Sequence, residues 1–98
     1  MLRGARPNWL IELVEVMEYE GSYRLIEFYV NPRHVVSVED HMPTPHLIEE
    51  TQRIGLAKRI EFSTITLKEY GTPKRVIVVG SARSISEKIN NRRGLLKG

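Results

Sequence analysis

The chain has 98 residues, of which 41% are hydrophobic and 28% are charged, and its formal net charge is +3. This length and composition fit one soluble globular domain, and no apolar run is long enough to span a membrane. Because the sequence contains no cysteine, it excludes disulfides, thiolate catalysis and zinc sites built on thiolates.

The first predicted elements are two strands joined by a tight turn. Residues 9–17 contain the β-branched Val14 and Val16, and the turn sequence YEGS follows them. A helix is the alternative for this segment, because its apolar residues also fit a helical period. In residues 23–30 the apolar side chains alternate, which predicts a strand with one face inward. The inward side chains are predicted to be Ile26, Phe28 and Val30.

The pair Asn31-Pro32 separates this hairpin from a third predicted strand over residues 35–40. Proline cannot donate a backbone hydrogen bond to a strand ladder, and it keeps the residue before it out of helical angles. The pair therefore ends the second strand at Val30 and begins an abrupt change of direction rather than a two-residue hairpin.

Residues 43–58 are predicted to form a helical insert, with the helix itself near 45–54. Thr44 is a suitable N-cap, Pro45 suits the first helical position, and Gly55 is the expected end. The apolar residues of the insert fall on one face, as in an amphipathic helix.

The segment after the insert holds two apolar pairs of opposite parity. Ile60 and Phe62 share one parity, whereas Ile65 and Leu67 share the other. Since one face of a regular strand cannot hold both pairs, the sequence predicts a bulge or bend near Ser63–Thr64.

The last two predicted elements are a strand over residues 75–80 and a C-terminal helix. Four consecutive apolar residues in the strand indicate an inner position in the sheet, or burial on both faces. Ser81 is the expected cap of the helix and Gly94 its expected end. The predicted fold class is α+β: about five mainly antiparallel strands, a C-terminal helix packed on the sheet, and the short inserted helix.

A single domain is expected over residues 1–98, in which 1–8 form an N-terminal extension and 94–98 a basic tail. Its core is predicted to bury seven side chains together: Val30, Val38, Ile65, Leu67, Val78, Ile85 and Ile89.

The order of these elements resembles that of the small FlbD-like proteins, which occur near flagellar and swarming genes and in short phage and bacterial reading frames. The matching positions are Val30, Asn31, Pro32, Val35, Val38, Glu39, Ile65, Leu67, Gly71, Val76, Val78, Ser81, Ile85 and Ile89. The resemblance spans roughly residues 10–90 and implies a small α+β domain without catalysis. The chain departs from the family in its longer N-terminal extension and in its insert. A looser similarity runs to the β-rich LytTR-type DNA-binding domains.

No residue pattern in the sequence favours catalysis, a cofactor or a metal. Five residues of metal-binding types lie in one region: His34, Glu39, Asp40, His41 and His46. A metal site needs three or four ligands that converge, and histidines in solvated loops are the favoured interpretation. Ser81 follows Gly80 but lacks the second glycine of a nucleophile motif, so N-capping explains it better. We therefore expect no enzyme.

Positive charge is concentrated in the last quarter of the chain. Residues 1–73 carry 8 basic and 11 acidic side chains, whereas residues 74–98 carry 7 basic and 1 acidic. Such a segment can neutralise phosphates, so a nucleic-acid-binding regulator is the alternative function. Its candidate residues are Lys74, Arg75, Arg83, Arg92 and Arg93. These residues form no single helical stripe, however, and the segment has no aromatic side chain on which a base could stack.

The function that we expect is a non-enzymatic regulatory or adaptor module that binds a protein partner, with homo-oligomerisation as one form of this. Small sheets leave edges that must be covered or paired, and self-association is a frequent solution. The insert is the main departure from the family pattern, and its candidate protein-binding residues are Glu49, Gln52 and Arg53. Glu12 and Glu15 interrupt the apolar N-terminal segment, which does not fit a signal peptide, so we expect a cytoplasmic protein without membrane association.

Overall fold

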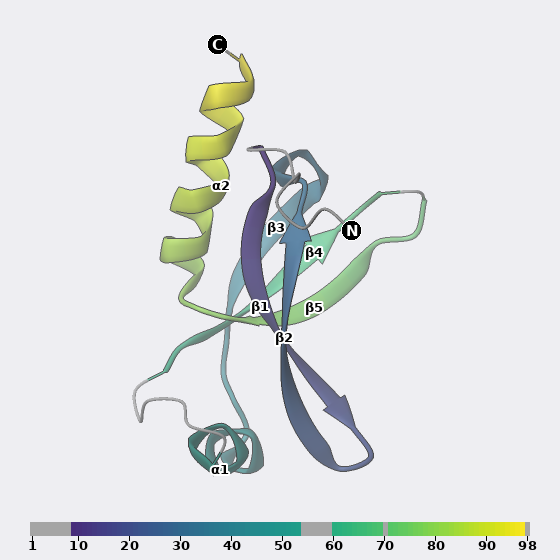
Figure 1. Cartoon of the computed structure of the whole chain (residues 1–98), viewed down its shortest axis with the longest axis vertical. Helices are drawn as coiled ribbons and strands as arrows, with labels where there is room; N and C mark the ends of the chain where they lie inside the picture. The colour runs from purple at the N-terminus through teal and green to yellow at the C-terminus, as the bar shows by residue number, and fades with distance from the viewer. Residues whose placement is uncertain (1–8, 54–59, 70, 98) are drawn as a thin grey trace, which may run out of the picture.

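The computed structural model describes residues 9–53, 60–69 and 71–97, with side chains described as far as residue 91. The elements are β1 (Ile11–Tyr19), β2 (Ser22–Val30), the 3₁₀ helix η1 (Pro32–His34), β3 (Val35–His41), α1 (Pro45–Arg53), β4 (Phe62–Leu67), β5 (Lys74–Val79) and α2 (Ala82–Lys97). All strand pairs are antiparallel, in the order β2-β1-β5-β4-β3 (Figure 1). The predicted α+β class, with a C-terminal helix and a short inserted helix, is confirmed.

β1 and β2 form a regular hairpin, which settles the first segment as a strand and not a helix. The register runs from Ile11 opposite Val30 to Tyr19 opposite Ser22. The two residues between the strands, Glu20 and Gly21, have φ angles of 51° and 81°. Positive φ at both central residues is typical of the type I′ turn, whose twist matches that of the flanking strands.

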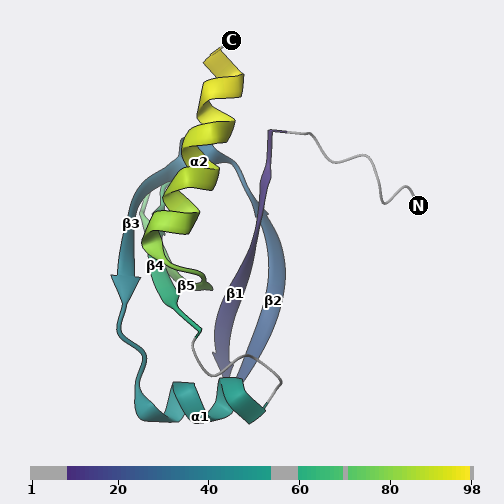
Figure 2. The ribbon, with the colours of Figure 1, turned by 90° about the vertical axis from the view of Figure 1, so that its left-hand side faces the viewer.

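β1 joins the rest of the sheet at a single ladder pair, Glu15 opposite Val78 in β5. β3, β4 and β5, by contrast, pair along most of their length. The hairpin and the three-stranded part therefore diverge on either side of this one pair. Figure 2 shows the result, with β3 and the hairpin on opposite sides of α2. The position of β5 between β1 and β4 confirms the predicted inner strand.

Two hydrophobic cores form, one with each helix. The larger core includes Ile85 and Ile89 of α2. Its other buried members are Ile11, Leu13, Val30, Val35, Ile65, Val76 and Val78. The smaller core combines Leu47 of α1 with Val16 and Phe62. All seven predicted core residues belong to the larger core, although Val38 and Leu67 are only partly buried.

The bulge predicted near Ser63–Thr64 is wrong. Throughout the described strand β4, the ladder with β5 is regular, and the ladder with β3 is regular from Phe62 to Thr66. Phe62 packs in the smaller core and Ile65 in the larger one. Because the strand buries side chains on both faces, a regular ladder accommodates both parities. The register of the sheet shifts instead within β3, between Val35 and Ser37.

Two further predictions are corrected. Ile26 has the parity of an inward residue, but its side chain is 41% exposed, since it lies in the edge strand opposite Glu15 rather than opposite an apolar side chain. Gly94 does not end α2, which continues to Lys97. A glycine inside a helix costs about 1 kcal/mol relative to alanine, which a long helix can tolerate. The expected helix end at Gly55 and the extension over 1–8 lie outside the described residues.

Side-chain caps fix the connections as the sequence predicts. The Asn31 side chain accepts a hydrogen bond from the backbone N–H of Arg33 at 2.9 Å, which begins η1 directly after β2. The Thr44 hydroxyl accepts from the N–H of Leu47 at 3.1 Å and caps α1. Ser81 caps α2 in the same way. No helix among the described residues is both long and apolar enough to cross a membrane.

We predict that Ile89→Ala lowers the free energy of unfolding by about 2–5 kcal/mol, because the side chain is buried in the larger core and its truncation leaves a cavity. Denaturant unfolding followed by circular dichroism measures this. Lys88→Ala changes the exposed neighbour and should stay within about 0.5 kcal/mol of the parent chain. Equal unfolding midpoints for Ile89→Ala and the parent would contradict the core assignment.

Candidate protein-binding surface

β2 is a long and regular edge of the sheet. It is last in the strand order, pairs with β1 and has nine residues without a register shift. The opposite edge strand, β3, has seven residues and contains the shift between Val35 and Ser37. Edge strands offer backbone N–H and C=O groups to another chain, and irregularities blunt this tendency. β2 is therefore the better of the two edges for adding a strand.

The hairpin also exposes apolar side chains between its middle and its turn. Met17, Tyr19 and Ile26 are 42%, 57% and 41% exposed. Alternation along the paired strands places them on the same face as Leu13 and Phe28, which belong to the larger core. Together with Arg24 they are called the hairpin surface below: Met17, Tyr19, Arg24 and Ile26.

The position of α2 explains why the hairpin surface is exposed. In Figure 1, α2 runs from the middle of the molecule away from the hairpin turn, so it covers only the part of the hairpin near the start of β1. Towards the turn, Arg24 lies opposite Met17, and its guanidinium carbon is 5.0 Å from the centroid of the Tyr19 ring. A cation over an aromatic ring at this distance is attractive and holds both side chains against the strands.

The other face of the hairpin is covered by α1. The Tyr23 and His46 rings lie 5.4 Å apart, centroid to centroid, and Leu25 packs against the smaller core that contains Leu47. Exposed apolar groups on a protein surface often mark a contact site when they are contiguous. On the hairpin, they lie on the face that α1 leaves uncovered.

The protein-binding residues predicted from the sequence lie on the outer side of α1. Glu49 and Gln52 are exposed, whereas Leu47 and Thr51 face inward and are buried. Arg53 is also exposed, and its Nη2 lies 3.3 Å from Oε2 of Glu50. Glu49, Gln52 and Arg53 thus form a polar helix face, separate from the hairpin surface. The hairpin surface was not predicted, because the alternation of residues 23–30 placed Ile26 on the inward face of its strand.

Three of the basic residues predicted to bind nucleic acid, Lys74, Arg75 and Arg83, have described side chains. Lys74 and Arg75 are neighbours in β5, so their side chains point to opposite faces of the sheet. The Arg75 guanidinium lies 3.6 Å from the Glu39 carboxylate, and the Arg83 guanidinium lies 3.6 Å from the Glu87 carboxylate within α2. The side chains of Arg92 and Arg93 lie outside the described residues.

The three histidines have separate surroundings. Nδ1 of His34 is 3.4 Å from Glu69, Nδ1 of His41 is 3.2 Å from the Thr64 hydroxyl, and His46 stacks obliquely on Tyr23. Within the part of the chain that the structure describes, no three His, Asp or Glu side chains are close enough to hold a metal ion. The Asp40 carboxylate instead accepts a hydrogen bond from the N–H of Ala82 at 3.0 Å, at the start of α2.

Comparison with known protein families, curated proteins and solved structures finds no match to this chain. The resemblance to the FlbD-like proteins therefore stays a prediction from the strand-end and core motifs.

We predict that Asp40→Ala destabilises the fold by about 0.5–2 kcal/mol, because it removes a carboxylate that caps the first turn of α2. Asp40→Asn should destabilise the fold much less, since the amide oxygen of asparagine can still accept a hydrogen bond from the Ala82 N–H. Thermal unfolding of both variants measures the difference. A metal-ligand role for Asp40 would instead make the unfolding of the parent chain sensitive to added Zn²⁺ and to a chelator.

Proposed function

We propose that this chain is a non-enzymatic protein-binding module, a regulator or adaptor, that pairs through β2 with a second copy of itself. The observation that carries the proposal is the nine-residue edge strand bordered by the exposed apolar side chains of the hairpin surface. Backbone hydrogen bonds along the edge would supply affinity, and burial of the apolar side chains would add to it.

The sequence of β2 suits antiparallel pairing with its own copy. Ile26 is the central residue of Ser22–Val30, so a two-fold axis at Ile26 pairs all nine residues. In this register Arg24 lies opposite Phe28 of the second copy, and Glu27 lies opposite Leu25 of the second copy. No like charges meet directly, and the Arg24–Phe28 pair is a favourable cation–aromatic contact.

Other registers are less favourable. An axis at Glu27 would place this carboxylate opposite itself, and an axis at Arg24 would do the same with two guanidinium groups, which is destabilising. An axis at Leu25 avoids like charges but places the last two residues of β2 beyond the end of the second strand. The side-chain order of β2 thus selects Ile26 as the centre.

The proposed dimer leaves α1 on the sheet face rather than on the paired edge. Its exposed side chains Glu49, Gln52 and Arg53 would then be presented twice, once by each copy. This arrangement suits an adaptor that displays two identical polar helices to a further partner. The nucleic-acid alternative has less support, because Lys74 and Arg75 point to opposite faces of the sheet, and Arg75 and Arg83 each lie beside a carboxylate.

We predict that Ile26→Lys weakens self-association at least about tenfold, because it places two ammonium groups opposite each other at the axis. Sedimentation velocity over a range of protein concentrations measures the dimer fraction. Ile48→Lys is the matched control, since Ile48 is 39% exposed but lies on α1, and this variant should associate like the parent chain. Circular dichroism checks that both variants are folded.

A parent chain that stays monomeric at the highest concentrations, or equal dimerisation of the two variants, would contradict the proposal. The alternative function is tested by measuring the affinity of the chain for duplex DNA at several salt concentrations. The logarithm of the binding constant is plotted against the logarithm of the salt concentration. A slope steeper than about −3, together with submicromolar affinity near physiological salt, would favour the nucleic-acid alternative.

A further inference from the structure

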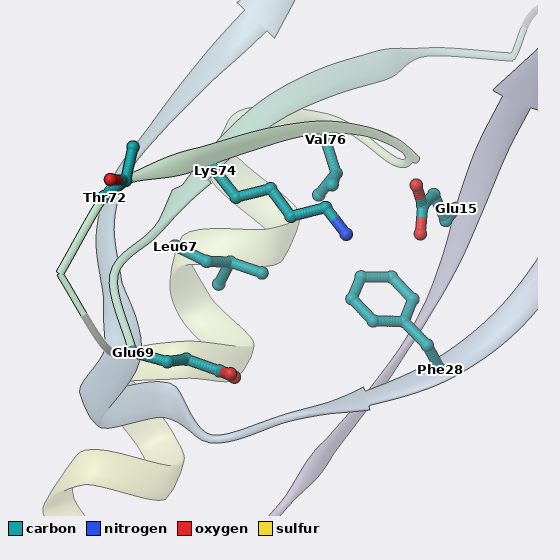
Figure 3. A pocket seen from close by; sticks show the side chains of 7 residues that line it. All are labelled: Glu15, Phe28, Leu67, Glu69, Thr72, Lys74 and Val76. Carbon is teal, nitrogen blue, oxygen red and sulfur yellow. The ribbon is translucent and has the colours of Figure 1, made fainter.

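A cavity of about 360 Å³ lies between the hairpin and the β4–β5 pair (Figure 3). Phe28 of β2, Leu67 of β4 and Val76 of β5 form its apolar walls. Glu15 of β1, Lys74 of β5 and Glu69 of the β4–β5 connection add three charged groups. This volume is within the range of natural sites for small molecules.

The cavity follows from the divergence of the two parts of the sheet. β1 and β5 are joined only at Glu15 and Val78, so the side chains beside this junction are not brought together by further pairing. Val76 is buried in the larger core, and Phe28 and Leu67 pack against that core. The apolar walls are therefore anchored in the core and are formed before any ligand binds.

The charged groups of the cavity are unbalanced. Two carboxylates and one ammonium give a formal net charge of −1. Figure 3 shows the Lys74 side chain extended above Leu67 with its ammonium end towards Glu15, while Glu69 lies on the opposite side of the cavity. Lys74 thus offsets Glu15, and the carboxylate of Glu69 is the excess negative charge.

The Glu69 carboxylate also approaches a side chain that does not line the cavity. Nδ1 of His34 lies 3.4 Å from a Glu69 oxygen, but this nitrogen is buried and makes no hydrogen bond among the described residues. Thr72, on the same connection, adds a hydroxyl to the lining.

We propose that this cavity binds a small organic cation, an ammonium group on an aromatic or branched aliphatic body. The apolar body would pack on Phe28, Leu67 and Val76, which favours its removal from water. The ammonium would lie within the negative field of the two carboxylates. Glu15 is half-buried, so its charge is screened less by water than the charge of the exposed Glu69. An organic anion of the same shape would meet a net negative lining and is disfavoured.

Two probes with the same ring and opposite charge test the proposal: phenethylammonium and 3-phenylpropanoate. Each is titrated into the ¹⁵N-labelled full chain, and affinity is read from amide shifts in the nuclear magnetic resonance spectrum. We expect phenethylammonium to bind at least about tenfold tighter, with shifts centred on Phe28, Leu67 and Val76. A tenfold ratio corresponds to about 1.4 kcal/mol.

Charge variants give opposite expected effects at the same site. Glu15→Gln with Glu69→Gln should weaken phenethylammonium binding at least about tenfold, and Lys74→Met should strengthen it several-fold, since it removes a like charge but keeps an apolar side chain. The control pair Glu18→Gln with Glu61→Gln changes the total charge equally at exposed positions that do not line the cavity. It should leave the affinity nearly unchanged.

Equal binding of the two probes, weaker cation binding by Lys74→Met, or shifts centred away from the cavity would overturn the proposal, as would no binding at millimolar probe. The titration is repeated over a range of protein concentrations, because a cavity within one chain binds the probe at any dimer fraction. Ile26→Lys does not serve here, since residue 26 lies opposite Glu15 of the cavity. An affinity that does not change with protein concentration separates the cavity from self-association, so failure of the dimer leaves the cavity test decisive.

Discussion

The single ladder pair between Glu15 and Val78 is the constraint on which the rest of the structure depends. A sheet joined along full strands would hold the hairpin and the three-stranded part side by side. Because only one pair joins them, the two parts diverge. The apolar face of each part must then be covered by another element, such as a helix. α2 meets this need by inserting Ile85 and Ile89 between Leu13 and Val30 on one side and Ile65 and Val78 on the other.

The inserted helix solves the corresponding problem on the other face. Val16 and Phe62 lie on opposite sides of the junction and point away from α2, so their burial requires a second cover, which Leu47 provides. The insert thus contributes to a hydrophobic core and also presents an exposed polar face. Its buried Thr51 bonds back to the Leu47 carbonyl at 2.9 Å, which satisfies a hydroxyl that would otherwise be costly to bury.

The sequence was sufficient to predict features that depend on residues close together in the chain, such as caps and turns. It was insufficient to predict which face of a strand is buried, because this depends on where the helices pack. Asn31, Thr44 and Ser81 cap or turn the chain through neighbours one to four residues away, so the chain order alone reveals them. The parity of Phe62 and Ile65 was read correctly, but the inferred bulge assumed one buried face. Likewise, the parity of Ile26 was correct and its burial was not, because α2 does not reach it. The cavity is lined by both Glu15 and Lys74, which are far apart in the sequence, so no local sequence pattern predicts that they lie together.

The exposed apolar side chains of the hairpin surface and the charged cavity arise from the same cause. One helix of α2's length cannot cover both the start of the hairpin and its turn, since it packs beside the junction and runs away from the turn. Towards the turn, Met17 and Tyr19 therefore stay exposed. Beside the junction, Ile26 is exposed and a hollow remains between Phe28 and Val76. A longer β1–β5 ladder would place Met17 beside Val76 and would close the hollow. The weak junction thus costs the fold buried apolar area, and in return it leaves a cavity and exposed apolar side chains that a sheet with a full β1–β5 ladder would cover.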